Sequence, residues 1–432
     1  MNILIVYKHL YYPIRKTSAH DLFCFEKYSK ENIFYLRLDY AYGKELSVPK
    51  HLFNVKFDAV LFHYGFSSIK FTSDKNIEEI IKKISILTSS IKIKVLFAQD
   101  EYLFTGRLNK LINKLNINTL FSVAPKSEWS KIYNNIDLNK VVIIQNLTGY
   151  IDDKEVENID ESDVENKTID IGYRARNLPQ WLGKHGYLKT KIANKFNEAC
   201  SKMNIKTDIS INPNDTLLGN RWFSFLLSCK YMIGVEGGAT VLDADGEIQK
   251  KGEAFIKHNP AASFEDIEKA CFPGLDGKLN LKAISPRHLE CCFTKTCQIL
   301  IEGEYNGILK PNVHYIPLKA DFSNIQEVLG VVKKDNLRKL IVANCFNDIV
   351  KSKKYNYSTY VQQVLQIIKP NEKSDNCSSL VQNELVKICL FYNKWFNKYT
   401  WVLSYAATID KWYFIEKLKS LKKVVTHKKS VF

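Results

Sequence analysis

Short apolar segments alternate with amphipathic segments over the first 150 residues, and this alternation limits the fold more than any other feature. The apolar segments cover 3–7, 33–38, 59–65, 94–100, 119–124 and 140–147, each long enough for one buried strand. Between them lie patterns such as NIEEIIKKISILTSS, in which apolar residues recur at helical spacing. Strands that alternate with helices predict an α/β fold with a parallel, doubly wound sheet.

The alternation stops at the acidic segment YIDDKEVENIDESDVENK and then resumes. We therefore expect a Rossmann-like domain over 1–149, an acidic linker over 150–167 and a second Rossmann-like domain over 168–375. Its strands are expected in the segments TIDIGYRAR, KTDISI, YMIGVEGG, CQILIEG and HYIPL, with an irregular stretch over 243–284. Residues 376–432 are expected to form helices and a basic tail. Two such domains usually bind a ligand between them, at the carboxyl ends of their strands.

The composition is that of a globular protein, with 45% apolar and 25% charged residues. No segment approaches the roughly 18 consecutive apolar residues of a spanning helix, and the N-terminus has no basic leader before its apolar run. The ten cysteines are scattered, without zinc-site spacing, which favours buried free thiols in a reducing compartment. We therefore expect a cytoplasmic location.

The formal net charge is +16, which suits an anionic partner. Nucleic acid, an anionic membrane surface and a nucleotide substrate all fit this charge, and a general bias toward lysine is the alternative explanation. The chain has neither a G-x-G-x-x-G motif nor a G-x-x-x-x-G-K-[ST] motif. Their absence counts against an NAD- or FAD-dependent enzyme and against a P-loop kinase or ATPase.

Polar residues follow two strands of the first half. The third predicted strand ends in His63 and Tyr64, and the fourth ends in Asp100, Glu101 and Tyr102. A carboxylate or imidazole at such a strand end can accept a proton from a hydroxyl nucleophile, so Asp100 and His63 are candidate catalytic bases. The alternatives are that Asp100 caps the following helix and that His63 is part of the cleft wall or core.

Two groups of residues follow strands of the second half. Arg174 and Arg176 come directly after the first of these strands, where guanidinium groups can clamp a diphosphate; a surface ion pair is the alternative. Glu236, Gly237 and Gly238 follow another strand, and the paired glycines allow a ligand to approach the backbone closely. A simple strand-to-loop turn is the alternative for this second group. Asp243 and Asp245, seven and nine residues after Glu236, have the spacing of a β-turn and lack the far acidic ligand of a calcium loop.

The segment SPRHLECCFTKTCQILIEGEYNGIL (285–309), followed by VHYIPLKADFSNIQEVL, resembles group 1 (family 4-like) glycosyltransferases of bacterial surface-polysaccharide biosynthesis. The segments IGYRARNLPQWLG and GVEGGATVLDADGEI add to this resemblance, which covers about 168–345. The resemblance implies the GT-B fold, in which two Rossmann-like domains face a central cleft and C-terminal helices cross back to the first domain. It implies that Glu290 binds the nucleotide ribose and that Arg174 and Arg176 bind the diphosphate.

Further site residues follow from the same resemblance. Ser285, Arg287 and His288 precede the ribose carboxylate at a helix N-terminus, a place that favours phosphate. Glu302 and Glu304 follow the strand CQILI, where they either touch the donor at the cleft edge or begin a turn. Two positions depart from the family pattern: Lys282 stands where many members have a sugar-binding glutamate, and Lys295 stands where a glycine is common. Glu236 or Asp243 is the expected replacement for that glutamate.

The predicted function is transfer of a sugar from a nucleotide-sugar donor to a glycan or lipid-linked acceptor of lipopolysaccharide or capsule biosynthesis. No cofactor or metal is expected, because basic side chains can offset the charge of the leaving diphosphate. The alternatives are a nucleotide-sugar epimerase or hydrolase of the same architecture and, less favoured, a nucleic-acid-binding protein. The C-terminal aromatic and lysine residues, including Trp395, Phe396, Trp401, Trp412, Tyr413 and Phe414, predict either packing against the first domain or peripheral contact with the inner face of the cytoplasmic membrane.

Overall fold

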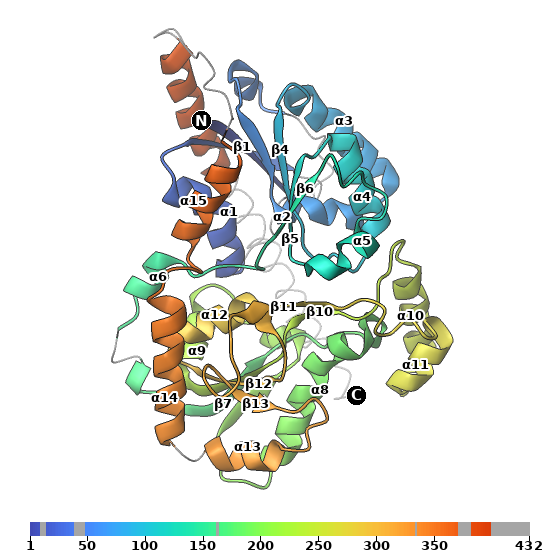
Figure 1. Cartoon of the computed structure of the whole chain (residues 1–432), viewed down its shortest axis with the longest axis vertical. Helices are drawn as coiled ribbons and strands as arrows, with labels where there is room; N and C mark the ends of the chain where they lie inside the picture. Colours follow the sequence, from blue (N-terminus) through green and yellow to red (C-terminus); the bar gives the residue numbers. More distant parts are fainter. Residues whose placement is uncertain (9–13, 39–47, 161–163, 333–334, 370–381, 399–432) are drawn as a thin grey trace, which may run out of the picture.

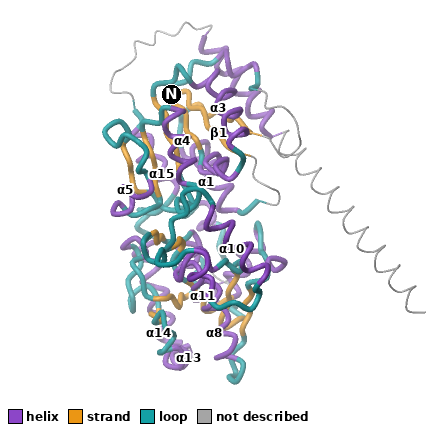
Figure 2. The backbone as a smooth tube through the Cα atoms, turned by 90° about the vertical axis from the view of Figure 1, so that its right-hand side faces the viewer, coloured by secondary structure: helices purple, strands orange, loops and turns teal. Residues whose placement is uncertain are grey.

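The structure, a computed structural model, describes residues 1–8, 14–38, 48–160, 164–332, 335–369 and 382–398. It consists of two lobes, each built on one parallel sheet (Figure 1). In the view of Figure 2, the strands lie inside a surrounding layer of helices in both lobes. Long apolar strands such as Asn2–Lys8 (NILIVYK) need this cover, because a parallel sheet buries both of its faces.

The first sheet has six strands in the order β2-β1-β3-β4-β5-β6, and every neighbouring pair is parallel. All six were predicted from the apolar segments. The strands are β1 Asn2–Lys8, β2 Asn32–Leu38, β3 Ala59–Phe62, β4 Ile93–Phe97, β5 Thr119–Ser122 and β6 Val142–Gln145. The helices of this half are α1 Lys16–Tyr28, α2 Tyr64–Ser67, α3 Asp74–Thr88, α4 Thr105–Leu115, α5 Trp129–Ile132 and α6 Asp153–Glu157.

The second sheet has the order β13-β12-β9-β7-β8 and is also parallel. Its strands are β7 Ile169–Arg174, β8 Thr207–Ser210, β9 Cys229–Gly234, β12 Cys297–Ile301 and β13 Ile316–Leu318. The helices are α8 Gly183–Cys200, α9 Asn220–Ser228, α10 Glu247–His258, α11 Phe264–Cys271, α12 Pro286–Phe293, α13 Ile325–Val332, α14 Asp335–Cys345 and α15 Tyr357–Ile367. A short antiparallel pair, β10 Gly237–Ala239 and β11 Leu281–Ala283, stands apart from the main sheet. The predicted α/β fold with two doubly wound sheets is thus confirmed.

The prediction that 243–284 is irregular is wrong, because the segment contains α10 and α11. Asp243 accepts hydrogen bonds from the Gly246 and Gln249 amides at the start of α10. Ser263 begins α11 with a capping box that includes Asp266. Apolar residues of both helices then pack around Trp181. Helix caps and helical spacing were present in this segment, and they outweigh its turn-forming glycines.

The two lobes are joined by segments that run side by side. Ile151 pairs through its backbone with Tyr355 and Tyr357, and α15 then packs on α1 in the first lobe. The acidic segment after Tyr150 is tied to α1 as well, because Asp152 pairs with Lys27 and Glu155 pairs with Lys16. Figure 1 shows α15 crossing back from the second lobe to the side of α1.

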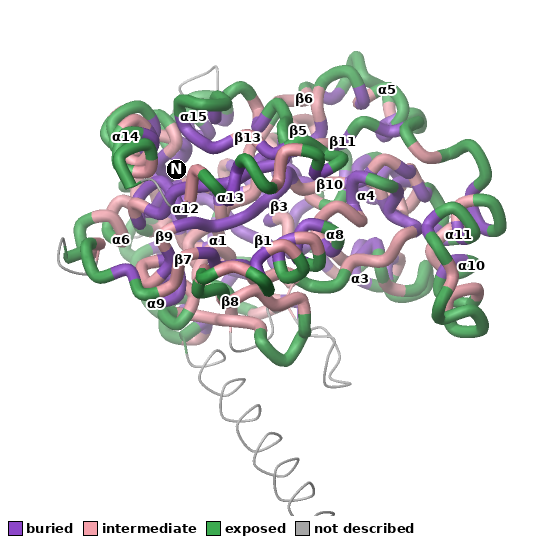
Figure 3. Tube along the Cα trace, turned by 90° about the horizontal axis from the view of Figure 1, so that it is seen from below, coloured by how far each residue is buried: buried purple, intermediate pink, exposed green. Residues whose placement is uncertain are grey.

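Residues 382–398 form a helix against the first lobe, and the remaining C-terminal residues, with Trp401, Trp412, Tyr413, Phe414 and the basic tail, lie outside the described residues. All nine described cysteines are buried and free, as predicted. Figure 3 shows the buried strands near the centre and exposed residues on outer helices such as α10, α11 and α14. Among the described helices, none is both long and apolar enough to cross a bilayer.

Candidate functional site

A pocket of about 510 Å³ lies between the lobes, at the carboxyl ends of both sheets. The first lobe contributes the residues that follow β1, β3 and β4, and the second contributes those that follow β7, β8 and β9. Parallel sheets bind ligands at this edge because their strands all end there. The wall consists of Arg15, Lys16, Thr17, Ser18, Tyr64, Gln99, Asp100, Thr148, Tyr173, Arg174, Ala175, Arg176, Leu178, Lys189, Asp215, Thr216, Leu217, Leu218, Gly219, Trp222, Val235, Ser285, Pro286, Arg287 and Glu290.

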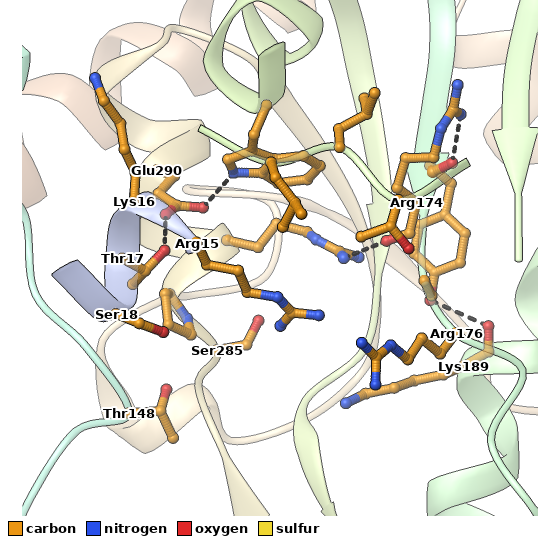
Figure 4. Close-up of a pocket in the computed structure, with 18 of the residues that line it drawn as sticks. Arg15, Lys16, Thr17, Ser18, Thr148, Arg174, Arg176, Lys189, Ser285 and Glu290 are labelled. Atoms are coloured by element: carbon orange, nitrogen blue, oxygen red, sulfur yellow. Dashed lines mark hydrogen bonds between the residues drawn. The ribbon is translucent and has the colours of Figure 1, made fainter. Parts of the chain in front are cut away.

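Three cationic side chains converge in this pocket without a carboxylate partner. Figure 4 shows Arg15 reaching in from the first lobe, with Arg176 and Lys189 side by side opposite it. Within the described part of the chain, none of these three side chains forms an ion pair or hydrogen bond. Burial, together with the nearby Arg287, lowers the pKa of Lys189 to about 8. Burial and the charges of Arg176 and Arg287 lower the pKa of Arg15. Such mutual repulsion is relieved when an anion enters.

Two helices also begin at this pocket. Lys16, Thr17 and Ser18 form the first turn of α1, while Ser285 and Pro286 lie at the start of α12. The first amides of a helix have no partner inside the helix, and the helix dipole makes this end positive. The helix ends therefore add to the attraction that the cationic side chains exert on an anion.

Glu290 lies at the same pocket and is almost fully buried. One carboxylate oxygen accepts a hydrogen bond from Thr17 Oγ1 at 2.8 Å, and the other accepts one from Trp222 Nε1 at 2.8 Å. Burial raises the pKa of this carboxyl group, while the bonds from Trp222 and Thr17 act in the opposite direction. Thr17 belongs to the first lobe and Glu290 to the second, so this contact closes the pocket from both sides.

The prediction that Arg174 clamps a diphosphate is corrected by the geometry. Its Nη2 donates to Asp208 Oδ1 at 2.7 Å, its Nη1 donates to two carbonyl groups, and the guanidinium lies 4.5 Å from the centre of the Phe225 ring. Figure 4 shows this side chain directed away from the open space. Arg174 contributes its carbonyl oxygen, which accepts a hydrogen bond from Arg287 Nη2. Arg176, by contrast, faces the pocket.

The structure also corrects the placement of His288. Its ring contacts Gln298 Oε1 through Nδ1 at 2.9 Å and the Val235 carbonyl oxygen through Nε2 at 3.3 Å. Burial lowers the pKa of His288 to about 4, so the ring is neutral near pH 7. His288, a residue of α12, therefore contacts β12 and the backbone after β9 and does not line the pocket wall.

Glu236 and the two glycines after it do not line the pocket; they hold neighbouring turns and strands in place. The Glu236 carboxylate accepts a hydrogen bond from the Tyr305 amide at 2.7 Å and so holds the turn after β12. Gly237 and Gly238 pair with β11. A Cβ on Gly238, which has a φ of 115°, would lie 2.0 Å from the Leu281 carbonyl oxygen. Glycine is required at this position by the close approach of β11.

In the first lobe, Asp100 and Tyr64 line the pocket as predicted. Asp100 has a left-handed backbone with φ 51°, and it does not cap a helix because α4 begins only at Thr105. Its Oδ1 accepts a hydrogen bond from the hydroxyl of Tyr102 at 3.2 Å. The buried Lys70 ammonium donates to the carbonyl groups of Gln99 and Asp100 and so fixes this strand end. Asp100 remains the carboxylate of the first lobe that faces the pocket.

His63 and Glu101 do not reach the pocket wall. His63 caps α2, accepting from the Gly65 amide, and its Nε2 lies 2.9 Å from Asp21 Oδ1. Glu101 is fully buried, where it accepts hydrogen bonds from Ser122, Tyr133 and the Val123 amide. The interpretation of Glu101 as a cleft-edge residue is wrong, because its partners all lie in the core of the first lobe.

The remaining predicted cleft residues also lie away from the pocket wall. Tyr102 packs among apolar residues, and its carbonyl oxygen accepts a hydrogen bond from the Asp243 amide. Glu302 and Glu304 are exposed in the turn that follows β12, which agrees with the turn alternative. Asp243 is occupied by the amides of Gly246 and Gln249 at the start of α10. None of these carboxylates belongs to a described group with metal-ligand geometry.

One described group has the spacing that a metal ion needs, namely His20, Asp152 and Glu155. Lys27 contacts both oxygens of Asp152, and Lys16 contacts both oxygens of Glu155. These lysines already supply the positive charge that a cation would bring. The group does not line the pocket, so we assign no metal to it.

Several pocket residues were missed by sequence reasoning. Arg15 to Ser18 follow β1 and obey the same strand-end rule that identified Asp100, so the signal for them was present. Lys189 and Trp222 lie within α8 and α9, away from any strand end. No local signal in the sequence distinguishes these two residues from ordinary helix residues.

No protein-family model matches the chain, and no curated protein matches it in sequence. Solved structures resemble it at low identity. An α-glucosyltransferase in complex with UDP-glucose and DNA containing an abasic site has 11% identity and a TM-score of 0.49, with 85% of this chain and 99% of that chain covered. A glycosyltransferase from Rickettsia africae has 13% identity and a TM-score of 0.48, with coverage of 85% and 97%. Anabaena HepE in complex with UDP has 9% identity and a TM-score of 0.47, with coverage of 85% and 99%.

The topology of the chain itself decides its fold. Two parallel sheets present their carboxyl ends to one pocket, and α15 crosses back to the first lobe. The chain has the GT-B fold. In this GT-B chain, the walls of the pocket combine unpaired cations, two helix starts and one buried carboxylate, which is an environment for a ligand with both a polyanionic part and hydroxyl groups.

Proposed function

We propose that this GT-B chain is a glycosyltransferase that takes its sugar from a nucleotide-sugar donor. The observation that carries the proposal is the meeting of Arg15, Arg176 and Lys189 with the buried Glu290 in one pocket. A nucleoside diphosphate matches both the cations and the carboxylate, because its diphosphate is anionic and its ribose carries a pair of hydroxyl groups. The cations bind the diphosphate, and the Glu290 carboxylate accepts hydrogen bonds from the ribose diol.

The same pocket residues account for the steps of the proposed glycosyl transfer. The hydroxyl oxygen of the acceptor forms a bond to the anomeric carbon, and the bond from that carbon to the diphosphate breaks. Negative charge develops on the leaving diphosphate, where Arg15, Arg176, Lys189 and Arg287 stabilise it. The hydroxyl proton is lost, and Asp100, on the opposite lobe of the pocket, is the group proposed to receive it.

The acceptor is proposed to be a glycan or a lipid-linked saccharide of bacterial surface-polysaccharide synthesis. The first lobe would bind it, since the strand ends of that lobe present Tyr64 and Asp100 to the pocket. The proposed setting is the cytoplasm, with peripheral contact at the inner face of the membrane where a lipid-linked acceptor is held.

Nucleotide binding is the first test. UDP, GDP and CMP are titrated calorimetrically into the wild-type chain, and one of the diphosphates is expected to bind. Glu290→Gln should weaken that binding by roughly 10- to 100-fold, because a hydrogen bond to a charged group contributes about 1.5–3 kcal/mol. Glu302→Gln, an exposed glutamate outside the pocket, is the matched control and should bind as the wild type does.

Wild-type affinity in the Glu290→Gln variant would remove Glu290 from the site. Release of nucleotide at an unchanged rate with and without acceptor would favour an epimerase or hydrolase over a transferase. Salt-sensitive binding of generic DNA, with no binding of any nucleotide, would support the nucleic-acid-binding alternative.

A further inference from the structure

The helix over 382–398 has one face that fastens it to the first lobe. Val386, Cys389, Asn393 and Asn397 are buried on this face. The side-chain amide of Asn393 bonds to both the amide and the carbonyl of Tyr35, and Asn397 accepts a hydrogen bond from the Tyr7 hydroxyl. Since β2 is the edge of the first sheet, Asn393 takes the place of a further strand there. The attachment of this helix is therefore specific.

The opposite face of the same helix is apolar and exposed. Ile388, Phe391, Tyr392 and Trp395 follow one another at spacings of three, one and three, which places them on one side of a helix. Their exposed fractions are 64%, 75%, 47% and 53%. We call these four residues the aromatic face. A contiguous apolar surface of this kind is uncommon on a soluble protein unless something covers it.

The charges around the aromatic face indicate what covers it. Lys387, Lys394 and Lys398 are exposed on the same helix, where Lys387 pairs with Glu384 and Lys394 pairs with Glu26 of α1. Glu384 is the single acidic residue within 382–398, and Lys398 forms no ion pair within the described residues. Lys50 precedes His51, which contacts the Tyr392 ring edge-on at a centroid distance of 4.9 Å. Aromatic rings flanked by lysines suit the boundary between water and lipid, where rings lie among the headgroups and ammonium groups meet anionic phosphates.

We propose that the aromatic face is a docking surface for an anionic lipid bilayer. The inference rests on the proposed function, in which the acceptor is lipid-linked, and it names the part of the molecule that meets the membrane. The helix is fastened to the first lobe through Tyr7, Tyr35 and Glu26, so the lobe proposed to bind the acceptor lies against the bilayer. The net charge of +16 also attracts the whole chain toward an anionic bilayer at longer range.

The test is flotation of the full chain with lipid vesicles. Vesicles of phosphatidylcholine alone are compared with vesicles of phosphatidylcholine and phosphatidylglycerol in equal parts. The wild type is expected to float with the anionic vesicles. The double variant Ile388→Ser, Phe391→Ser should bind them about tenfold or more weakly, because it removes the most exposed apolar side chains of the face.

Ile86→Ser is the matched control, since Ile86 on α3 is 68% exposed and belongs to the same lobe. This variant should float as the wild type does. Wild-type flotation of the double variant, or a wild type that does not float with anionic vesicles, would overturn the proposal. So would a wild-type dimer in light scattering that the double variant converts to a monomer, because the aromatic face would then belong to a second copy of the chain.

Nucleotide titration of the same proteins separates the two proposals. The double variant should retain nucleotide affinity, since neither substituted residue lines the pocket. Loss of vesicle binding with intact nucleotide binding supports the docking surface. Absence of nucleotide binding in the wild type would count against the proposed function whatever the vesicles show.

Discussion

At the residue scale, the direction of a side chain decides whether a residue near a strand end reaches the pocket. Arg174 and Arg176 follow the same strand and were expected to act as a pair. The structure directs the first toward Asp208 and the second into the pocket. Lys189, which lies thirteen residues beyond Arg176 on α8, meets Arg176 there instead. The cationic group is thus assembled from a strand end, a helix face and the other lobe.

The titration of Lys189 predicts how nucleotide binding depends on pH. With a pKa of about 8, its ammonium is charged below that pH and loses its proton above it. A bound diphosphate favours the charged form, so affinity should be full below this range and fall as the pH rises through about 8. Calorimetric titration of the diphosphate across this range measures the effect.

Lys189→Arg provides the control for that prediction, because a guanidinium keeps its charge throughout this pH range. The affinity of this variant should vary less with pH than that of the wild type. An identical pH dependence in the two proteins would show that Lys189 does not contact the diphosphate.

At the scale of elements, the arm between β10 and β11 ties the second lobe to the first. The segment carries α10 and α11, and its Asp243 and Ala244 pair through the backbone with Tyr102, Phe104 and Gly106. Leu279 and Leu281 pack in the apolar core of the first lobe. The arm therefore holds the lobes together on the side opposite to α15, as Figure 1 shows.

Removing the cap of α10 should destabilise this arm. Asp243→Ala deletes the side-chain acceptor for the amides of Gly246, the N-cap residue, and Gln249. The loss of such an acceptor at a helix start costs about 1 kcal/mol of the free energy of unfolding. Urea denaturation followed by circular dichroism measures the change. Asp245→Ala, two residues on and exposed, is expected to leave the midpoint unchanged, and equal midpoints for the wild type and the Asp243 variant would contradict the capping role.

At the scale of the whole molecule, the pocket exists only because two lobes meet. Thr17 bonds to Glu290, and Thr148 Oγ1 donates to the Ile284 carbonyl oxygen at 2.5 Å. The carboxylate proposed for the ribose is thus held by the first lobe in this structure. A ribose diol would share or replace the Thr17 bond, so nucleotide binding and the closure of the lobes act on the same carboxylate.

Treatment with a chelator tests whether the side chains of the pocket offset the charge of the leaving nucleoside diphosphate without a metal ion. Four cationic side chains from both lobes are proposed for this role, so transfer activity should be unchanged after treatment with EDTA. The rate of diphosphate release is measured with and without the chelator. An activity lost in EDTA and restored by magnesium would contradict the prediction.

The sequence alone predicted both sheets, because the apolar period of a strand and the spacing of a helix are local properties that burial in a parallel sheet preserves. It placed Asp100, Tyr64, Arg176, Arg287 and Glu290 near strand ends and a helix start, and all five line the pocket. It missed α10 and α11 by expecting an irregular stretch over 243–284, and it assigned Glu101 and His288 to the cleft.

Only the tertiary structure decided which of these side chains face the pocket and which face the core. Glu290 meets Thr17 across 273 positions of sequence, and Glu101 turns toward Tyr133 on a neighbouring segment. The direction of each side chain depends on partners that packing brings together from distant parts of the sequence, so no local sequence pattern predicts it. The chain's periodicity determines where strands end, while the contact of the two lobes determines what those ends can bind.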